Sequence, residues 1–165
     1  MRDLSTTIAV YPDMATAEKD WTAVEAAAKA HSIDLADAAL IEKPSTVETV
    51  TIHRESHHGW GKGAVAGAVV GVLFPPAVLG AAAVGAGSGA VVARMNRSLD
   101  RGDLNDLSEV MDTGEIAVVA VTHTDSVPTL DQTLTSATNK ISRSSSTAEE
   151  VQQALDEDNK ATTRK

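Results

Sequence analysis

The chain contains no cysteine, and among its 165 residues it has only one Phe, one Tyr and two Trp. The lack of cysteine excludes disulfides, thiolate nucleophiles and cysteine metal sites, and it is compatible with a reducing compartment. With so few aromatic side chains, any hydrophobic core must be built from Ala, Val, Leu and Ile, and thin cores of this kind often depend on partners. A chain of this length is long enough for one domain with a core.

Basic residues are also few, because 14 Lys and Arg stand against 23 Asp and Glu, which gives a net charge of −9. This excess argues against contacts that follow the phosphates of a nucleic acid, so nucleic acid is not an expected partner. Segment 59–99 has no acidic residue and is the only electropositive part of the chain. The apolar run before Pro12 is too short for a secretory signal, so we expect a cytoplasmic N-terminus.

The spacing of apolar residues predicts the elements of the first part of the chain. Strands are expected over residues 7–11, 33–42 and 46–53, where β-branched or alternating apolar residues are bounded by proline-containing turns. A helix is expected over residues 14–32, because apolar residues recur there at spacings of three and four. The apolar stripe of this helix consists of Ala17, Trp21, Val24, Ala28 and His31.

After residue 98 the chain again alternates between helix and strand signals. A short helix capped by Asp103 is expected to end at Gly114, and residues 115–123 are the most apolar predicted strand, suited to a central position. A further helix is expected after Ser126. Its apolar stripe consists of Leu130, Leu134, Ala137 and Ile141.

The end of the domain is less regular. The segment Arg143–Ser146 is expected to break the preceding helix, and a last strand could only be a weak one over residues 140–145. Ser146 begins a capping-box pattern, which predicts a final amphipathic helix before a polar tail. That tail is expected to be mobile.

In sequence, these elements come close to βαββαβ, the ferredoxin-like split motif. We therefore predict an α+β fold, a ferredoxin-like βαββαβ sandwich interrupted by a glycine-zipper helical hairpin. Residues 1–58 and 98–146 would form the two parts of the α+β domain, and residues 59–97 would form the hairpin. Residues 147–165 would form a C-terminal helix and tail.

The predicted hairpin is the most distinctive segment, because residues 63–93 include seven glycines and no charged residue. Gly63, Gly67 and Gly71 follow at four-residue spacing, and Gly85 and Gly89 repeat it, so a helix would carry a groove along one face where another backbone can approach closely. A glycine costs a helix about 1 kcal/mol relative to Ala, which close helix packing would offset. Two prolines would end the first arm and begin the second. The predicted hairpin positions are Gly59, Gly63, Gly67, Gly71, Phe74, Pro75, Pro76, Ala81, Gly85, Gly89 and Ala93.

The hairpin fits a membrane poorly. A first arm over residues 62–74 would be about 20 Å long against a hydrocarbon core of about 30 Å. The eleven Val, Leu and Phe residues of 63–93 would contribute only about 3 to 7 kcal/mol to insertion. Packing between hairpins of several copies is therefore favoured over insertion, and a hairpin folded back on its own domain is a third reading. Flanking residues suited to a membrane surface or an interface are Trp60, Lys62, Arg94 and Arg97.

The run HHGWGKGAVAGAVVGVLFPPAVLGAAAVGAGSGAV, followed by a short acidic helix and the strand GEIAVVAVTH, resembles a known bacterial family. The family is labelled domain of unknown function twelve-sixty-nine, and its members are often described as membrane proteins and are similar to glycine-zipper general stress proteins. The resemblance covers residues 5–140. It implies a ferredoxin-like domain interrupted by a small-residue hairpin, and it implies no activity.

Other candidate sites are weaker. His53, His57 and His58 could bind zinc, copper or nickel, but Glu55 is the only nearby carboxylate, so solvated or membrane-surface histidines are favoured. Lys62 lacks the following Ser or Thr of a phosphate-binding loop. Ser88 lies inside an apolar arm rather than on the strand-to-helix turn of a hydrolase elbow.

We therefore expect a non-enzymatic structural or stress-related protein, without cofactor or metal, that forms a homo-oligomer through its glycine-zipper hairpin. The alternative is a protein associated with the inner face of the cell membrane, with lipid as the partner of the hairpin. A histidine-based metal-binding module is a remote alternative.

Overall fold

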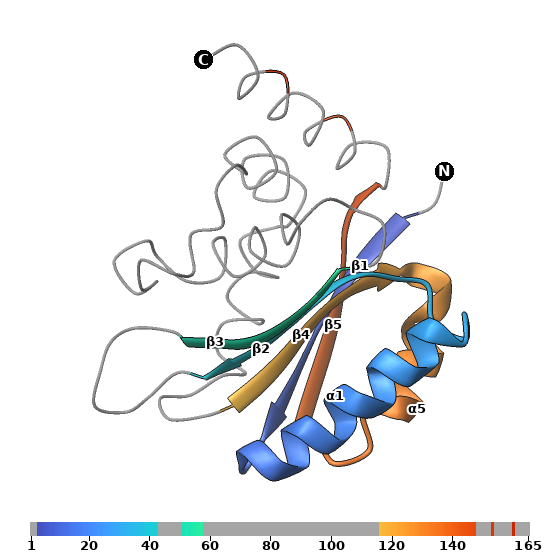
Figure 1. The fold of residues 1–165 in the computed structure, drawn as a ribbon. Helices are drawn as coiled ribbons and strands as arrows, with labels where there is room; N and C mark the ends of the chain where they lie inside the picture. Colours follow the sequence, from blue (N-terminus) through green and yellow to red (C-terminus); the bar gives the residue numbers. More distant parts are fainter. Residues whose placement is uncertain (1–2, 43–50, 58–115, 148–152, 154–159, 161–165) are drawn as a thin grey trace.

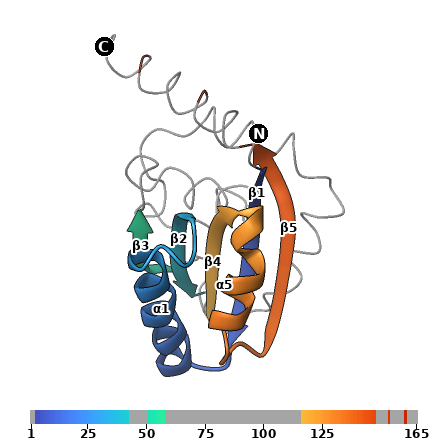
Figure 2. The same cartoon turned by 90° about the vertical axis from the view of Figure 1, so that its right-hand side faces the viewer.

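The computed structural model describes residues 3–42, 51–57, 116–147, 153 and 160, and these form an α+β domain with a five-stranded antiparallel sheet and two α-helices. The strand order is β3-β2-β4-β1-β5. Both helices cover the same face of the sheet, and they lie next to one another (Figures 1 and 2). The elements are β1 (Asp3–Tyr11), α1 (Met14–Lys29), β2 (Leu35–Glu42), β3 (Thr51–His57), β4 (Ile116–His123), a 3-10 turn (Thr124–Ser126), α5 (Val127–Thr133) and β5 (Asn139–Thr147).

The predicted strands are found, with changes at their ends. β1 begins at Asp3, earlier than expected, because its first residues pair with the ends of β4 and β5. β2 begins at Leu35 rather than at residue 33, although Ile33 is buried in the loop before it. β3 extends to His57, and the predicted start of this strand at 46–50 lies outside the described residues. β4 is the central strand and is buried along its whole length, as its apolar run predicts.

Helix α1 begins where the sequence places it. The side chain of Asp13 caps it by accepting a hydrogen bond from the backbone N–H of Thr16 at 2.8 Å. The apolar stripe packs against the sheet, where Trp21 and Val24 lie in the main core with residues of β1, β2 and β4. This part of the stripe is confirmed.

The end of α1 corrects the prediction, because the helix stops at Lys29 and does not continue to residue 32. His31, which the periodicity places on the apolar stripe, is exposed and has a positive φ of 57°. The backbone N–H of His31 donates to Ala28 and that of Ser32 donates to Ala27, so the last carbonyls of the helix are satisfied by a left-handed turn. The chain then reverses toward β2.

The segment after α5 also differs from its prediction. α5 ends at Thr133 rather than continuing to Ile141. Leu130 and Leu134 are buried as the stripe requires, but Ile141 lies in β5 opposite Ile8 of β1. This segment pairs with β1 instead of continuing the helix. Backbone hydrogen bonds to a strand distant in the sequence outweigh its weak preference for helix.

The last strand is therefore correct in kind and longer than the predicted range 140–145. Residues Arg143–Ser146 do not break a helix but continue the strand, which runs from Asn139 to Thr147. Ser146 lies in β5, so the predicted helix cap at this residue is wrong. Farther along the chain, Gln153 and Lys160 have helical backbone.

Candidate functional site

The residues that the sequence marks for the hairpin and its flanks, from Gly59 to Arg97, all lie outside the described residues. The predicted short helix at 103–114 and the third histidine, His58, lie outside them as well. The hairpin positions therefore stay a prediction. The groups described below all belong to the α+β domain.

The structure places His53 and His57 on strand β3, where they are farther apart than they would be on a helix. A helix would bring His53 and His57 to within one turn of each other, but both lie on a strand, where four residues span about 13 Å. The Nε2 atom of His53 lies 2.7 Å from the Oε2 atom of Glu42 on the neighbouring strand β2. Within the described ranges, no group of three His, Cys, Asp or Glu side chains could hold a metal ion.

The sheet has two chemically distinct faces. The face under the helices carries Tyr11, Leu40 and Val118, which form one core with the buried side of α1 and α5. The opposite face, called the second face below, is formed by the alternate residues of the same strands. Its buried apolar members are Leu4, Ile8, Val10, Ala39, Ile41, Ala117, Val119 and Val121.

The second face is apolar in its middle and more polar at one end. Ile8, Val119 and Ala39 are directly opposite one another across three strands. Toward the carboxyl end of β4, Thr6 and Asp37 flank Val121 in the same way, and both are buried. The Oδ1 atom of Asp37 accepts a hydrogen bond from the backbone N–H of Ala38 at 3.0 Å.

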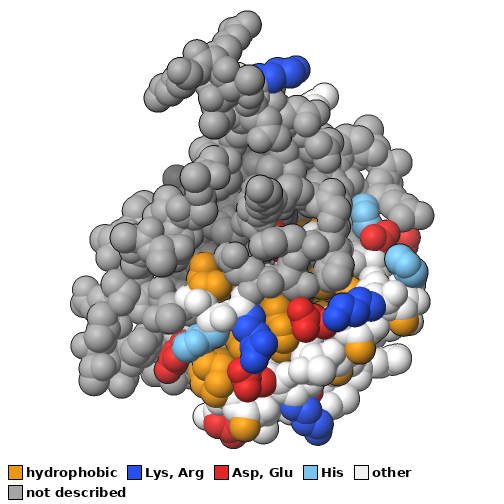
Figure 3. All heavy atoms as spheres, in the orientation of Figure 1, with side chains coloured by type: hydrophobic (Ala, Val, Ile, Leu, Met, Phe, Trp, Pro, Cys, Tyr) orange, Lys and Arg blue, Asp and Glu red, His pale blue; other side chains and the backbone are white. Residues whose placement is uncertain are grey.

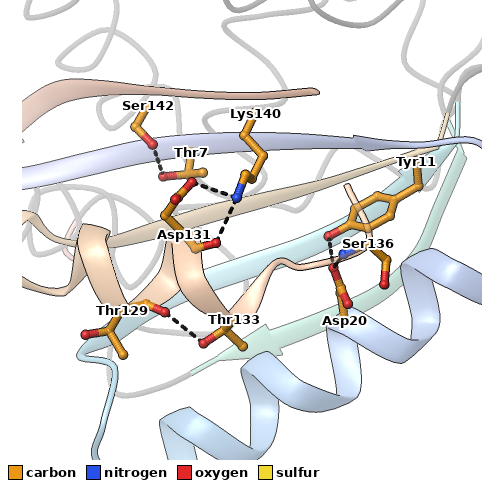
Figure 4. Close-up of polar contacts among 9 residues, drawn as sticks. All are labelled: Thr7, Tyr11, Asp20, Thr129, Asp131, Thr133, Ser136, Lys140 and Ser142. Atoms are coloured by element: carbon orange, nitrogen blue, oxygen red, sulfur yellow. Dashed lines mark hydrogen bonds and ion pairs between the residues drawn. The ribbon is translucent and has the colours of Figure 1, made fainter. Parts of the chain in front are cut away.

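A buried polar cluster joins α1 to β1 and to the loop after α5. The phenol of Tyr11 donates a hydrogen bond to the Oδ2 atom of Asp20 at 3.1 Å, and the backbone N–H of Ser136 donates to the same oxygen at 2.8 Å (Figure 4). Asp20 is 1% exposed. The hydroxyl of Thr135 donates to the other oxygen, Oδ1, at 3.5 Å. A carboxylate held by these donors in the core fixes the loop against the helix, which is a structural role.

The environment of Tyr11 favours its neutral form. Burial raises the pKa of the Tyr11 phenol above its ordinary value, and the nearby Asp20 carboxylate, through its charge and its hydrogen bond, raises it further. Sequence reasoning alone does not select this pair. A signal is present, because Asp20 follows Ala17 by three residues and precedes Val24 by four, which places a carboxylate on the apolar stripe.

His123 at the end of β4 lies near the loop before β2. Its Nε2 atom is 3.6 Å from the Oδ2 atom of Asp34, and its buried Nδ1 atom has no hydrogen-bond partner among the described residues. The hydroxyl of Ser126 accepts a hydrogen bond from the backbone N–H of Asp34 at 2.9 Å. Serine, histidine and aspartate are the residue types of a hydrolase triad, but here the hydroxyl is engaged by a backbone amide and holds the loop.

Exposed contacts are mixed in sign over the described surface. Arg54 on β3 pairs with Glu18 on α1 at 3.0 Å, and Lys140 on β5 pairs with Asp131 on α5 at 2.9 Å. Figure 3 shows basic and acidic side chains lying close together on the visible face. Figure 4 shows the second of these pairs. Neutralised pairs of this kind give no field of one sign that would attract a polyanion.

No helix within the described part of the chain is long and apolar enough to cross a membrane. Comparisons with curated proteins and with solved structures gave no match. A family model described as "Protein of unknown function (DUF1269)" matches residues 61–158, more than half of the chain. This match begins later and ends later than the resemblance expected from the sequence, so that β1, α1, β2 and β3 precede it. The chain therefore belongs to the DUF1269 family of proteins of unknown function.

Proposed function

We propose that this protein is a non-enzymatic structural protein that assembles into a homo-oligomer through its glycine-zipper hairpin, residues 59–97. The observation that carries the proposal is the four-residue spacing of glycine within a charge-free segment. Small residues at this spacing let two helices approach closely, and this contact offsets the low helical preference of glycine. The partner is thus a second copy of the same chain.

The described domain supports this proposal by its chemistry. Its surface carries paired charges, and its buried polar cluster at Asp20 serves to fix a loop. Its strands β1, β2, β4 and β5, with α1 and α5, follow one another in the order of a ferredoxin-like βαββαβ domain, and β3 adds an edge strand beside β2. We interpret this domain as the carrier of the hairpin in a cytoplasmic protein, with a role in stress as the resemblance suggests.

The test is the mass of the assembly in solution. Gly67→Leu combined with Gly71→Leu places two large side chains in the proposed groove, one helical turn apart. We expect sedimentation analysis to show an oligomer for the natural chain and a shift toward the 17.1 kDa monomer for the double variant. Circular dichroism should show that the α+β domain remains folded.

The matched control is Ala66→Leu combined with Val70→Leu, which has the same spacing and lies about 100° away around the helix. This control should leave the mass of the oligomer unchanged. An unchanged particle size in the glycine variant, or a monomeric natural chain, would reject the proposal.

The second candidate function is membrane association, in which the hairpin enters the bilayer. It is favoured by one observation, the basic residues Lys62, Arg94 and Arg97 on either side of the charge-free run, which would stay on the cytoplasmic side of an anionic membrane. Flotation with anionic vesicles, followed by a carbonate wash, separates the two functions. A chain that floats and resists carbonate would support the membrane function over assembly in solution.

A further inference from the structure

Strand β5 lies at one edge of the described sheet, beside β1, and adds little to the core (Figure 2). Side chains of this strand are described over residues 139–144, and none of them is buried. β1 is the opposite case, because every residue from Leu4 to Tyr11 is buried. An element with few buried apolar contacts opens at a lower free-energy cost than the core beside it. β5 can therefore leave the sheet while the rest of the domain stays folded.

The loop between α5 and β5, residues 134–138, ties this strand to the core. The backbone N–H of Ser136 donates to the Oδ2 atom of Asp20 at 2.8 Å (Figure 4). The backbone N–H of Thr138 donates to the carbonyl oxygen of Val10 at 2.8 Å, and the hydroxyl of Thr138 donates to the same oxygen at 3.1 Å. The start of β5 is thus fixed by polar contacts of the loop rather than by apolar burial of the strand.

The sequence of this loop also fits a longer helix. Leu130, Leu134, Ala137 and Ile141 have helical spacing, although α5 ends at Thr133. If the loop continues α5, the chain no longer turns back at residues 134–138, and β5 is directed away from its own β1. A segment that can be bent in one state and helical in another has the property that a hinge for strand exchange requires.

The departure of β5 exposes the edge of a buried apolar strand. β1 then presents unpaired backbone groups where β5 had been paired with it, and such an edge is a template for another strand. β5 itself fits this edge, since Ile141 lies opposite Ile8 and Ser142 lies opposite Thr7. A second copy of the chain offers the same strand, and the exchange of identical elements forms the same contacts as the closed domain.

We propose that the loop at residues 134–138 is a hinge at which β5 is exchanged between two copies of the chain. Each β5 then completes the sheet of the other copy by pairing with its β1. The surface is the edge of β1 that β5 vacates, and the partner is a second copy. This contact is separate from the hairpin contact of the proposed function, because all of its residues belong to the described α+β domain.

The test uses the fact that the chain has no cysteine, so an introduced pair of thiols reports a single contact. Thr7 on β1 and Ser142 on β5 are opposite each other, and their hydroxyl oxygens lie 2.7 Å apart. One full-length chain carries Thr7→Cys and the other carries Ser142→Cys. The two folded chains are mixed, incubated and oxidised, and mass spectrometry measures the disulfide between unlike chains. Because a disulfide requires Cα atoms within about 7 Å, this link reports an exchanged β5.

The matched control replaces the Ser142→Cys chain by an Ala120→Cys chain. Ala120 is opposite Thr7 on the other neighbouring strand, β4, and is 0% exposed. β4 does not follow the hinge, so we expect this mixture to give at least about tenfold fewer links between unlike chains. A chain that carries both Thr7→Cys and Ser142→Cys should link within itself, and this reaction sets the time scale of oxidation.

We expect links between the Thr7→Cys and Ser142→Cys chains, and about fivefold faster linking when both chains also carry Asp20→Asn. This substitution removes the negative charge that strengthens the hydrogen bond from Ser136 and thereby loosens the hinge. The mixture without Asp20→Asn decides the matter if that variant does not fold. The absence of links between chains, after times at which the doubly substituted chain has linked, would overturn the inference. Equal linking in the Ala120→Cys mixture would also overturn it, because the whole sheet would then be opening.

The same measurement separates this inference from the hairpin proposal. The mixture is repeated in chains that also carry Gly67→Leu and Gly71→Leu. Links between chains in this background would keep the strand exchange even where the hairpin contact has been lost. An oligomer of the natural chain whose β5 never links to a second copy would reject the exchange and leave the hairpin as its contact.

Discussion

Tyr11 and Asp20 illustrate how a single buried pair can join three parts of this domain. The carboxylate lies on α1, the phenol comes from β1, and the second donor is the backbone of Ser136 in the loop before β5. An ionised phenol could not donate to the carboxylate, and it would place a second negative charge beside it. The neutral phenol is thus part of the folded state.

This pair predicts a loss of stability in alkaline solution. Because the pKa of Tyr11 is raised in the folded chain above its ordinary value of 10.0, the unfolded chain loses the phenol proton first. The contribution of Tyr11 to stability is complete below about pH 10 and then falls by about 1.4 kcal/mol for each further pH unit until the folded chain also ionises. The chain has a single tyrosine, so ultraviolet absorbance of the tyrosinate reports this group alone.

We expect the tyrosinate signal to appear together with unfolding, followed by circular dichroism, rather than near pH 10 in the folded chain. Tyr11→Phe is the control, and it should lose part of the pH dependence of stability above pH 10. A tyrosinate signal near pH 10 in a protein that is still folded would contradict this account of the pair.

At the scale of elements, the ends of helices and strands were decided by contacts that local periodicity does not contain. α1 stops before His31 because the chain must turn into β2, and the left-handed residue satisfies the last carbonyl groups of the helix. β5 forms because Ile141 and its neighbours find the free edge of β1. In both places a helical stripe in the sequence continued past the end of the real helix.

The turn after α1 gives a prediction at this scale. His31→Gly should raise the free energy of unfolding by about 0.5 kcal/mol. Removing the side chain relieves a cost of about 1 kcal/mol in the left-handed region, but glycine loses more backbone entropy on folding, which offsets part of that relief. Ala30→Gly, one residue earlier at φ −80°, should lower it by about 0.5 to 1 kcal/mol. Urea denaturation of the two variants measures both, and changes of the same sign would show that the turn is not the cause.

At the scale of the whole domain, stability depends on buried residues on both faces of the sheet. Leu40 and Ile41 are neighbours on β2 and are both 0% exposed, but Leu40 faces the helices and Ile41 faces away from them. With few aromatic residues in the chain, the small apolar residues of the second face form a large share of its buried surface.

These two residues form a matched pair for measurement. Leu40→Ala and Ile41→Ala should each cost about 2 to 5 kcal/mol, since both remove a large buried side chain. A cost below about 1 kcal/mol for Ile41→Ala alone would show that the second face is not packed. If Ile41→Ala does not fold, Ile41→Val replaces it as the test of packing on the second face, with an expected cost of about 1 kcal/mol.

The sequence by itself determined the elements whose signals are local and strong. The apolar run of β4, the capped start and the Trp21–Val24 stripe of α1, the class of the fold and the family resemblance could all be predicted, because periodicity and composition are properties of neighbouring residues. The hairpin positions also come from the sequence and remain a prediction. Only the tertiary structure decided the full length of β5 and its pairing with β1, the end of α1 before His31 and the burial of Asp20. Each of these depends on backbone or side-chain partners that are distant in the chain, and spacing within one segment carries no information about them.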